Sequence, residues 1–251
     1  MQDDQLLRYS RQIMLPDMEI SGQQKLIEAT VLIVGMGGLG SPAALYLAAA
    51  GVGKLIIADD DTVELSNLQR QIAHDQQSLG RAKVESAKSR LLGINPSLEV
   101  ESYKQRLEGK ELDRLVEQAD LVVDACDNFG TRFAINQSCL KFSKPLVSGA
   151  AIRMEGQVIV FDPAKPESPC YRCLYDEQGD EDTSCATNGV MSPVVGIIGT
   201  VQAMEAIKVL ADVGQPLVGR LLLLDAKSMQ WREMKLKRDP SCPACSKAHV
   251  E

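Results

Sequence analysis

The segment GMGGLG, from Gly35 to Gly40, restricts the fold of this chain more than any other part of it. It follows a short apolar run, Val31–Val34, and precedes a stretch of small residues, Leu39–Ala50, which Gly51 ends. The apolar run predicts a buried parallel strand, and the small residues predict a helix with a glycine stop. Glycines in such a turn let the backbone approach phosphates, whose charge a helix N-terminus stabilises. The segment therefore predicts a nucleotide-binding strand–turn–helix unit.

The surroundings of this turn narrow the choice of nucleotide. Gly35, Gly37 and Gly40 have the G-x-G-x-x-G spacing, and Asp59 ends the next expected strand. A carboxylate roughly 20 residues beyond the turn is the usual ribose ligand of dinucleotide-binding folds. We expect Gly37 and Gly38 at the phosphates of NAD or ATP, the alternative being a turn that serves only helix–strand packing. The G-x-x-x-x-G-K-[ST] phosphate loop is absent, so ATP would bind in the dinucleotide manner.

Strand-like and helix-like segments alternate through the first half of the chain, which predicts a parallel sheet with right-handed crossovers. The expected strands are Val31–Val34, Lys54–Asp59, Glu99–Ser102 and Leu121–Ala125. The expected helices are Leu39–Ala50, one that Ser66 opens with Gln69 in a capping box, Lys83–Leu92, Glu111–Ala119 and Thr131–Phe142.

The pattern changes after Leu146. Expected strands at Gln157–Phe161, Leu221–Asp225 and Trp231–Leu236 flank a long apolar helix, about Pro193–Leu210. We expect one domain over residues 1–251, with a Rossmann-like α/β sheet and helices on both faces. The nucleotide-binding half, about 1–150, should be parallel, and the second half, about 151–251, mixed or antiparallel.

Charge and composition exclude several classes of protein. The net charge is −7 and no run is rich in lysine or arginine, so we expect neither a nucleic-acid nor a membrane partner. The polar start, Met1–Gln12, is no secretory signal, and the apolar stretch Val190–Val201 is too short and glycine-rich to span a bilayer. Four of the seven cysteines form two C-x-x-C pairs, which suits a reducing compartment. A cytoplasmic enzyme is expected.

Several polar residues suit the handling of phosphates. Asn67 and Arg70 lie three apart in SNLQRQ, Lys83 follows in GRAKVESA, and Asp127 and Asn128 follow an expected strand at the edge where α/β sheets bind ligands. Arginine and lysine neutralise charge that develops on phosphate, and aspartate can hold Mg²⁺. Hydride transfer needs no such set, so its presence favours nucleotidyl transfer. Each residue taken singly is equally compatible with a solvated surface charge.

The two C-x-x-C pairs are Cys170–Cys173 and Cys242–Cys245. Each pair can give two thiolates to one tetrahedral Zn²⁺, and four thiolates close the site, so the metal would be structural. It would pin the C-terminal segment to the body of the fold. The alternative is a redox dithiol.

The other three cysteines differ in their surroundings. Cys126 and Cys139 lie in apolar segments and are expected in the core. Cys185 lies in the polar segment EDTSCATNG, where a small hydrophobic residue has no packing reason to be. We weigh it as a possible nucleophile.

Together these motifs resemble the MoeB/ThiF family, the bacterial relatives of ubiquitin-activating enzymes. The resemblance covers about Leu7 to Cys245. It is carried by R-Y-S-R-Q at Arg8–Gln12, GMGGLG, D-x-D-x-V at Asp59–Val63, SNLQRQ, D-N-x-x-x-R at Asp127–Arg132, SGAAIRMEGQ at Ser148–Gln157 and the two C-x-x-C pairs.

The resemblance implies ATP-dependent adenylation of the C-terminal Gly-Gly carboxylate of a small β-grasp sulfur-carrier protein. It implies Asp59 at the ribose, Asn67, Arg70 and Lys83 at the phosphates, Asp127 at Mg²⁺, and a homodimer in which Arg11 reaches the partner's ATP site. SGAAIRMEGQ and REMKL look more like the molybdopterin branch than the thiamine branch. The larger eukaryotic relatives carry a rhodanese domain, so here a separate sulfur donor, a cysteine desulfurase or a rhodanese, is expected. Relatives place a thioester- or persulfide-forming cysteine near the position of Cys185.

The residue inventory suits this chemistry. A terminal carboxylate, with a pKa of about 3.3–3.7, is ionised at neutral pH and needs no general base. The only histidines, His74 and His249, lie in no catalytic pattern. The alternatives are the same reaction on the thiamine-pathway carrier, an NAD-dependent oxidoreductase, and a scaffold that binds ATP without turnover.

Overall fold

A mixed β-sheet runs through both halves of the chain. The computed structural model describes residues 1–176 and 188–246, and within them the strand order is β3-β2-β1-β4-β5-β6-β7-β8. The parallel strands are β1 (Thr30–Val34), β2 (Lys54–Ala58), β3 (Glu99–Tyr103), β4 (Leu121–Asp124) and β5 (Leu146–Ile152). The antiparallel strands are β6 (Glu155–Phe161), β7 (Arg220–Asp225) and β8 (Gln230–Lys235). The predicted change from a parallel to a mixed sheet is confirmed.

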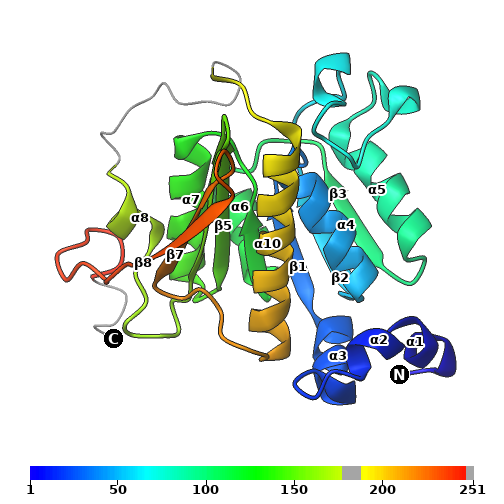
Figure 1. Cartoon of the computed structure of the whole chain (residues 1–251), viewed down its shortest axis with the longest axis horizontal. Helices are drawn as coiled ribbons and strands as arrows, with labels where there is room; N and C mark the ends of the chain where they lie inside the picture. Colours follow the sequence, from blue (N-terminus) through cyan, green and yellow to red (C-terminus); the bar gives the residue numbers. More distant parts are fainter. Residues whose placement is uncertain (177–187, 247–251) are drawn as a thin grey trace.

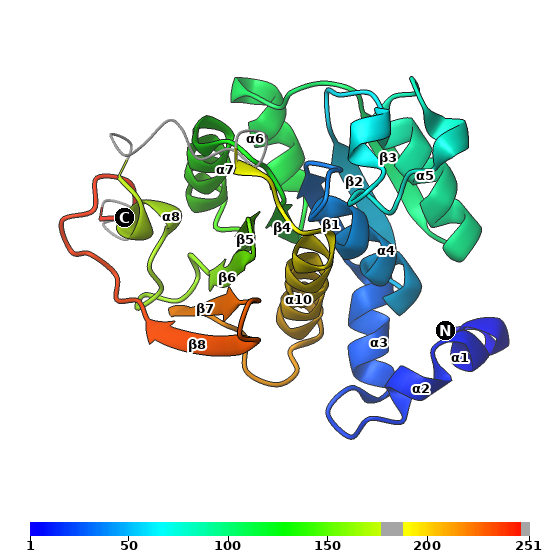
Figure 2. The same ribbon diagram turned by 45° about the horizontal axis from the view of Figure 1, so that its top comes forward.

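Helices cover both faces of the sheet, as predicted. On β1, Val31 and Ile33 pack with α4 (Gly40–Ala50), α5 (Lys83–Ile94) and α10 (Ser192–Ala211). Leu32 and Val34 point the other way and pack with α6 (Gly109–Gln118) and α7 (Phe129–Lys141). Figures 1 and 2 show α4 and α10 on one side of the sheet and α6 and α7 on the other. Because both faces are covered, β1 reads as a continuous apolar run rather than an alternating one.

The apolar helix α10 is longer than expected. Its 20 residues are long and apolar enough to cross a membrane by length and composition, so the expectation that this stretch is too short is wrong. The helix crosses α4 closely: a Cβ added at Gly199 would lie 2.3 Å from the Leu39 carbonyl oxygen. Its buried residues pack against α4 and the sheet, and the core thus accounts for its apolar character.

Around Ser66 the prediction of a helix is wrong. The chain forms only a 3₁₀ turn, η1 (Leu65–Asn67), and then irregular turns. The capping box is made by Glu64 and Asn67, not by Ser66 and Gln69, and the Glu64 amide donates to the Asn67 side-chain oxygen at 3.1 Å. This local bond stabilises a turn instead of continued helix.

Five of the described α-helices and β-strands were not predicted from the sequence, and four of them lie outside the cysteine region. They are β5 and the helices α1 (Asp3–Arg8), α2 (Ser10–Ile13) and α3 (Glu19–Glu28), which precede the sheet. A short helix, α8 (Tyr171–Leu174), also lies within the first C-x-x-C pair. The three N-terminal helices lie at one end of the molecule, beyond α4 (Figure 1).

Candidate active site

A cavity of about 1010 Å³ opens at the carboxyl ends of the parallel strands. Seven of the residues that the sequence analysis placed at the nucleotide line this cavity: Gly37, Gly38, Asp59, Arg70, Lys83, Asp127 and Asn128. It continues past the end of β5 to Gln157 on β6, Leu223 on β7 and Arg232 on β8. The cavity therefore joins the nucleotide-type turn of the first half to the antiparallel strands of the second.

The glycine turn is tightly packed against its neighbours. Gly35 has φ +97°, and a Cβ there would lie 2.6 Å from the Ala125 carbonyl oxygen. A Cβ at Gly40 would lie 1.9 Å from the carbonyl oxygen of Gly35. Glycine is required at both positions, because any side chain would collide with backbone. These two glycines are thus explained by packing, while Gly37 and Gly38 line the cavity.

Asp59 ties the turn to the end of β2. One carboxylate oxygen accepts the Met36 amide at 2.7 Å and the other accepts the Asp61 amide at 2.9 Å. Burial raises the pKa of Asp59, and the Lys83 ammonium opposes that rise. Asp59 is placed as a ribose ligand would be, at the carboxyl end of the strand after the turn.

Lys83 is a nearly buried cation in the wall of the cavity. Its side chain is 7% exposed, and its Nζ lies 2.7 Å from Asp61 Oδ2 and 3.9 Å from Asp59 Oδ1. The Asp61 side chain is 67% exposed, so the stronger ion pair is open to solvent on one side. Lys83 could therefore exchange the exposed Asp61 carboxylate for an incoming phosphate, and no buried ion pair would be broken.

Asp127 and Asn128 follow β4, as predicted. Asp127 is exposed, and Asn128 caps α7, accepting the Thr131 amide at 2.9 Å. Arg106 also donates to the Asn128 side-chain oxygen at 2.9 Å. The oxygen of Asn128 is therefore already engaged, whereas Asp127 is exposed and lines the cavity.

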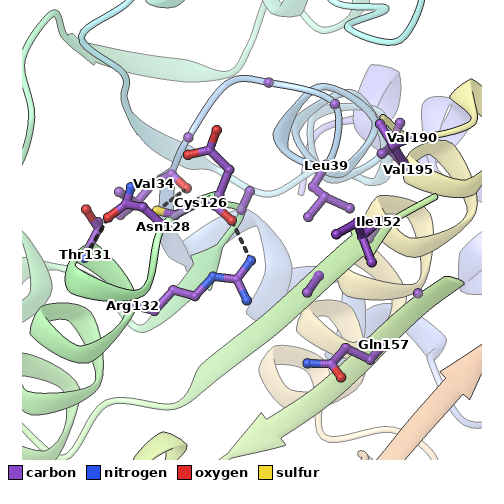
Figure 3. Close-up of a pocket in the computed structure, with 18 of the residues that line it drawn as sticks. Val34, Leu39, Cys126, Asn128, Thr131, Arg132, Ile152, Gln157, Val190 and Val195 are labelled. Atoms are coloured by element: carbon purple, nitrogen blue, oxygen red, sulfur yellow. Dashed lines mark hydrogen bonds between the residues drawn. The ribbon is translucent and has the colours of Figure 1, made fainter. Parts of the chain in front are cut away.

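A buried network of hydrogen bonds around Arg132 and Asp124, next to the segment that follows β4, was not predicted from the sequence. Arg132 donates to the carbonyl oxygens of Cys126 (2.5 Å) and Gly149 (3.1 Å), and its Nε lies 3.8 Å from Asp124 Oδ2. Asp124 also accepts the Ser148 hydroxyl at 2.7 Å. Figure 3 shows the Arg132 guanidinium directed at Cys126. The only sequence signal was the arginine that ends D-N-x-x-x-R, and no role was assigned to it.

Arg70 and Asn67 are placed differently from one another. Arg70 lines the cavity and donates to the Ser66 carbonyl oxygen at 3.1 Å. Asn67 is buried in the capping box of η1 and is not among the lining residues. Its position at the phosphates stays a prediction from the family resemblance.

Arg11 lies outside the cavity, on the exposed side of α2. The residues around it are anchored: Tyr9 is buried and its hydroxyl accepts from Asn95 at 3.0 Å. Gln12 donates at 3.0 Å to the carbonyl oxygen of Ala50, at the end of α4. The segment around α2 is thus fixed to its own chain, while Arg11 itself is exposed. Cys185 lies outside the described residues.

An aromatic wall that was not predicted borders the second half of the cavity. Phe129 and Tyr175 line it with their ring centroids 5.6 Å apart, and Gln157 donates to the Tyr175 hydroxyl. Tyr175 also packs on the buried Tyr171, 5.0 Å between centroids, which lies between the first two paired cysteines. The cysteine cluster and the cavity are therefore joined through aromatic contacts.

The four paired cysteines come together, as predicted. Their Sγ atoms all lie within 4.8 Å of one another, and the closest pairs are Cys170–Cys173 at 3.9 Å, Cys170–Cys242 at 3.7 Å and Cys173–Cys245 at 3.6 Å. Tetrahedral Zn²⁺ with bonds of about 2.3 Å needs sulfurs about 3.8 Å apart. Hydrogen bonds from the Cys170 thiol and from backbone amides lower the pKa of Cys173 to about 5. The set fits a structural zinc and shows no disulfide.

Cys126 and Cys139 are buried, as expected of core residues, and burial raises the pKa of both thiols.

Comparison with known proteins finds relatives along nearly the whole chain. The chain is 46% identical over 251 residues to the sulfur carrier protein ThiS adenylyltransferase of Escherichia coli (strain K12), which covers 100% of this chain and 99% of that protein. It is 49% identical over 243 residues to the molybdopterin-synthase adenylyltransferase of the same organism, 97% of each chain. It is 43% identical over 249 residues to the SAMP-activating enzyme E1 of Haloferax volcanii, covering 98% of this chain and 91% of that protein.

The fold is also found among solved structures. The crystal structure of E. coli MccB with ATP superposes with a TM-score of 0.82 at 24% identity, over 95% of this chain and 73% of that chain. The model of the ThiF family matches residues 9–244. The chain therefore belongs to the ThiF family.

Proposed function

We propose that this protein is an adenylyltransferase that uses ATP to activate the C-terminal carboxylate of a small sulfur-carrier protein. The observation that supports this proposal most strongly is a single cavity. It is lined by the glycine turn, Asp59, Arg70, Lys83 and Asp127, and it extends to the antiparallel strands. The cited relatives are named adenylyltransferases or activating enzymes, and this chain matches them over nearly their whole length. An oxidoreductase, the alternative from another class, finds no support in these relatives.

The reaction is an in-line substitution at phosphorus. A carrier carboxylate oxygen forms a bond to the α-phosphorus of ATP, the bond from that phosphorus to the bridging oxygen breaks, and pyrophosphate leaves with the electron pair. Negative charge builds on the phosphates as this occurs, and cations held nearby stabilise it. Arg70 and Lys83 line the cavity and are the candidates for this role.

The metals follow from the donor sets. Asp127, exposed after β4, would hold Mg²⁺, which would supply positive charge against the phosphates. The four paired cysteines would hold Zn²⁺ away from the reacting atoms, as a staple.

The carrier tail would enter along the second half of the cavity. Gln157, Tyr175, Leu223 and Arg232 line that half. A carrier tail that ends in Gly-Gly has no bulky side chains, so it could reach from these residues to the glycine turn in the same cavity. We favour the molybdopterin synthase small subunit, and the thiamine-pathway carrier is the alternative, since relatives of both kinds are similarly close. Sulfur would come from a separate donor, and the enzyme would act in the cytoplasm as a homodimer.

The test is ATP–pyrophosphate exchange with each carrier. Exchange should require Mg²⁺ and a carrier ending in Gly-Gly. Arg70→Ala and Lys83→Ala should each lower the rate by on the order of 10²-fold, because each removes charge stabilisation from the transition state. Arg81→Ala is the matched control, since Arg81 is an exposed cation close to Lys83 in sequence and absent from the cavity lining. Near-normal exchange in both cavity variants would contradict the assignment.

Cys185 has no part in the adenylation step, because that step needs no thiol. Cys185→Ala should leave exchange within about threefold of the unsubstituted protein. Loss of carrier thiocarboxylation alone in this variant would assign Cys185 a later covalent role.

A further inference from the structure

A buried imidazole lies behind the glycine turn. His74 is 7% exposed, its Nε2 lies 3.0 Å from the Met36 carbonyl oxygen, and its Nδ1 lies 3.0 Å from the Ser86 hydroxyl. A carbonyl oxygen can only accept, so Nε2 carries the proton and Nδ1 accepts from Ser86. Burial also lowers the pKa of His74, which keeps the ring neutral. One tautomer is therefore selected, and both of its ring nitrogens are satisfied.

The hydrogen bond from His74 sets the orientation of one peptide group. That group joins Met36 to Gly37 and is trans, because the described residues contain no cis peptide bond. In a trans peptide the carbonyl and the amide point in opposite directions. With the Met36 carbonyl held toward His74, the Gly37 amide points away from the ring, on the side of the cavity that Gly37 lines.

The Gly37 amide is available to a ligand. Among the described residues no group accepts a hydrogen bond from it, whereas the Met36 amide is engaged by Asp59 at 2.7 Å. A backbone amide that faces a cavity ahead of a helix N-terminus is a donor for a phosphate oxygen.

Ser86 links the same imidazole to the helix of a second phosphate-handling residue. Lys83 begins α5 and Ser86 lies one turn later, so the two occupy neighbouring positions on the helix surface. The chain Ser86–His74–Met36 thus connects the helix of the cation to the turn that carries the amide.

We propose that His74 is a positioning residue, which turns the Gly37 amide into the cavity and so contributes to binding of the nucleotide phosphates. The inference rests on the proposed function in one respect, that the cavity binds a nucleotide. The competing interpretation is a core histidine that contributes to stability alone.

Two amide substitutions separate these interpretations. His74→Gln places a side-chain amide near the position of Nε2 and can still donate to Met36. His74→Asn reaches only the position of Nδ1 and cannot. Binding of MgATP and of adenosine is measured by calorimetry on the whole protein, with thermal unfolding of each variant as a check on folding. We expect His74→Asn to weaken MgATP about tenfold, or about 1.4 kcal/mol, with adenosine affected less than twofold. His74→Gln should keep MgATP within about threefold.

Each outcome decides the question. Equal MgATP affinity in the Gln and Asn variants overturns the inference, and so does an equal loss for MgATP and adenosine. If the unsubstituted protein binds no MgATP, the proposed function fails as well. If His74→Asn does not fold, Ser86→Ala serves in its place, because it keeps the ring but releases its tautomer. It should weaken MgATP about threefold and leave adenosine unchanged, and no difference between the two ligands would again overturn the inference.

Discussion

Two buried cations at the cavity, Arg132 and Lys83, have different kinds of partner. Arg132 bonds to the carbonyl oxygens of Cys126 and Gly149 and pairs with Asp124, whose side chain is 1% exposed. Lys83 pairs most closely with the exposed Asp61. Removing one member of a buried ion pair leaves the other uncompensated, whereas an exposed partner is rehydrated by water. Arg132 is therefore assigned to holding the loop, and Lys83 is free to serve a ligand.

Arg132→Ala should lower the free energy of unfolding by about 3–5 kcal/mol, because it leaves Asp124 buried without its cation. Lys83→Ala should cost less stability, although it affects exchange more directly. Urea denaturation at pH 7.5 gives the free energy of unfolding of both variants and of the unsubstituted protein, so the two losses of stability can be compared. A larger loss of stability in Lys83→Ala would contradict this division of roles.

His74 also makes stability depend on pH. Burial lowers its pKa in the folded protein, with Lys83 acting in the same direction and Asp59 and Asp75 opposing. The unfolded chain therefore binds a proton first as the pH falls, so stability is full above about pH 6.5 and declines below it. When the pH is lowered from 7.5 to 5.5, the melting temperature of the unsubstituted protein should fall by more than that of His74→Gln. Equal losses in thermal scans would show that His74 does not titrate in this way.

At the scale of elements, α8 and the C-terminal segment depend on each other. Cys170 and Cys173 at α8 meet Cys242 and Cys245, about seventy residues later in the chain. Among the described residues neither segment is a strand of the sheet, and the thiolate cluster connects the two, with Arg238 also donating to the Pro166 carbonyl oxygen. The same α8 presents Tyr171 to the aromatic wall of the cavity. A metal there would order the wall as well as the C-terminal segment.

Cys245→Ser should lower the zinc content and reduce the melting temperature by about 5 °C or more, because metal binding is coupled to folding. Proteolysis near the C-terminus should become faster in this variant. Cys139→Ser, a buried thiol outside the cluster, is the control for the loss of a sulfur atom. Freshly purified protein without zinc would refute the assignment of the four thiolates.

At the scale of the whole molecule, the N-terminal helices expose an apolar surface. Leu7 is 77% exposed, Met14 71%, Leu15 56% and Ile20 56%, and all lie close in sequence to Arg11. Clustered exposed apolar residues of this kind mark a surface for a protein partner. Since Arg11 is exposed and does not line its own cavity, we propose that a second copy covers this surface and receives Arg11.

Mixed dimers test whether Arg11 acts in the partner. Arg11→Ala and Arg70→Ala chains should each be inactive alone, while coproduced chains should recover about a quarter of the exchange activity. Half of randomly paired dimers are mixed, and each mixed dimer has one intact site. The distribution of the two chains is checked with two affinity tags. No recovery in purified mixed dimers would place Arg11 at the site of its own chain, and full activity of Arg11→Ala alone would place it outside the reaction.

Local rules allowed much of the fold to be predicted from the sequence. The glycine turn was predicted from the spacing of its glycines between an apolar run and a stretch of small residues, and β1 to β4 were predicted as successive strands from their apolar runs. The cysteine cluster was equally readable, because C-x-x-C spacing and thiolate chemistry specify a ligand set before the fold is known. These features depend on residue type and short spacing.

Contacts between distant segments were decided only by the tertiary structure. Arg132 and His74 are both polar residues in the sequence, yet one bonds to carbonyl oxygens just after β4 and on β5, and the other supports Met36. Their roles depend on which groups the sheet brings within 3 Å or so, and no local pattern carries that information. β5, which pairs with the predicted β6, was missed: the turn that joins them has Arg153 at φ +54° in place of the glycine or asparagine that signals a hairpin. Sequence by itself determined the kind of chemistry, and tertiary packing decided which side chains are free to perform it.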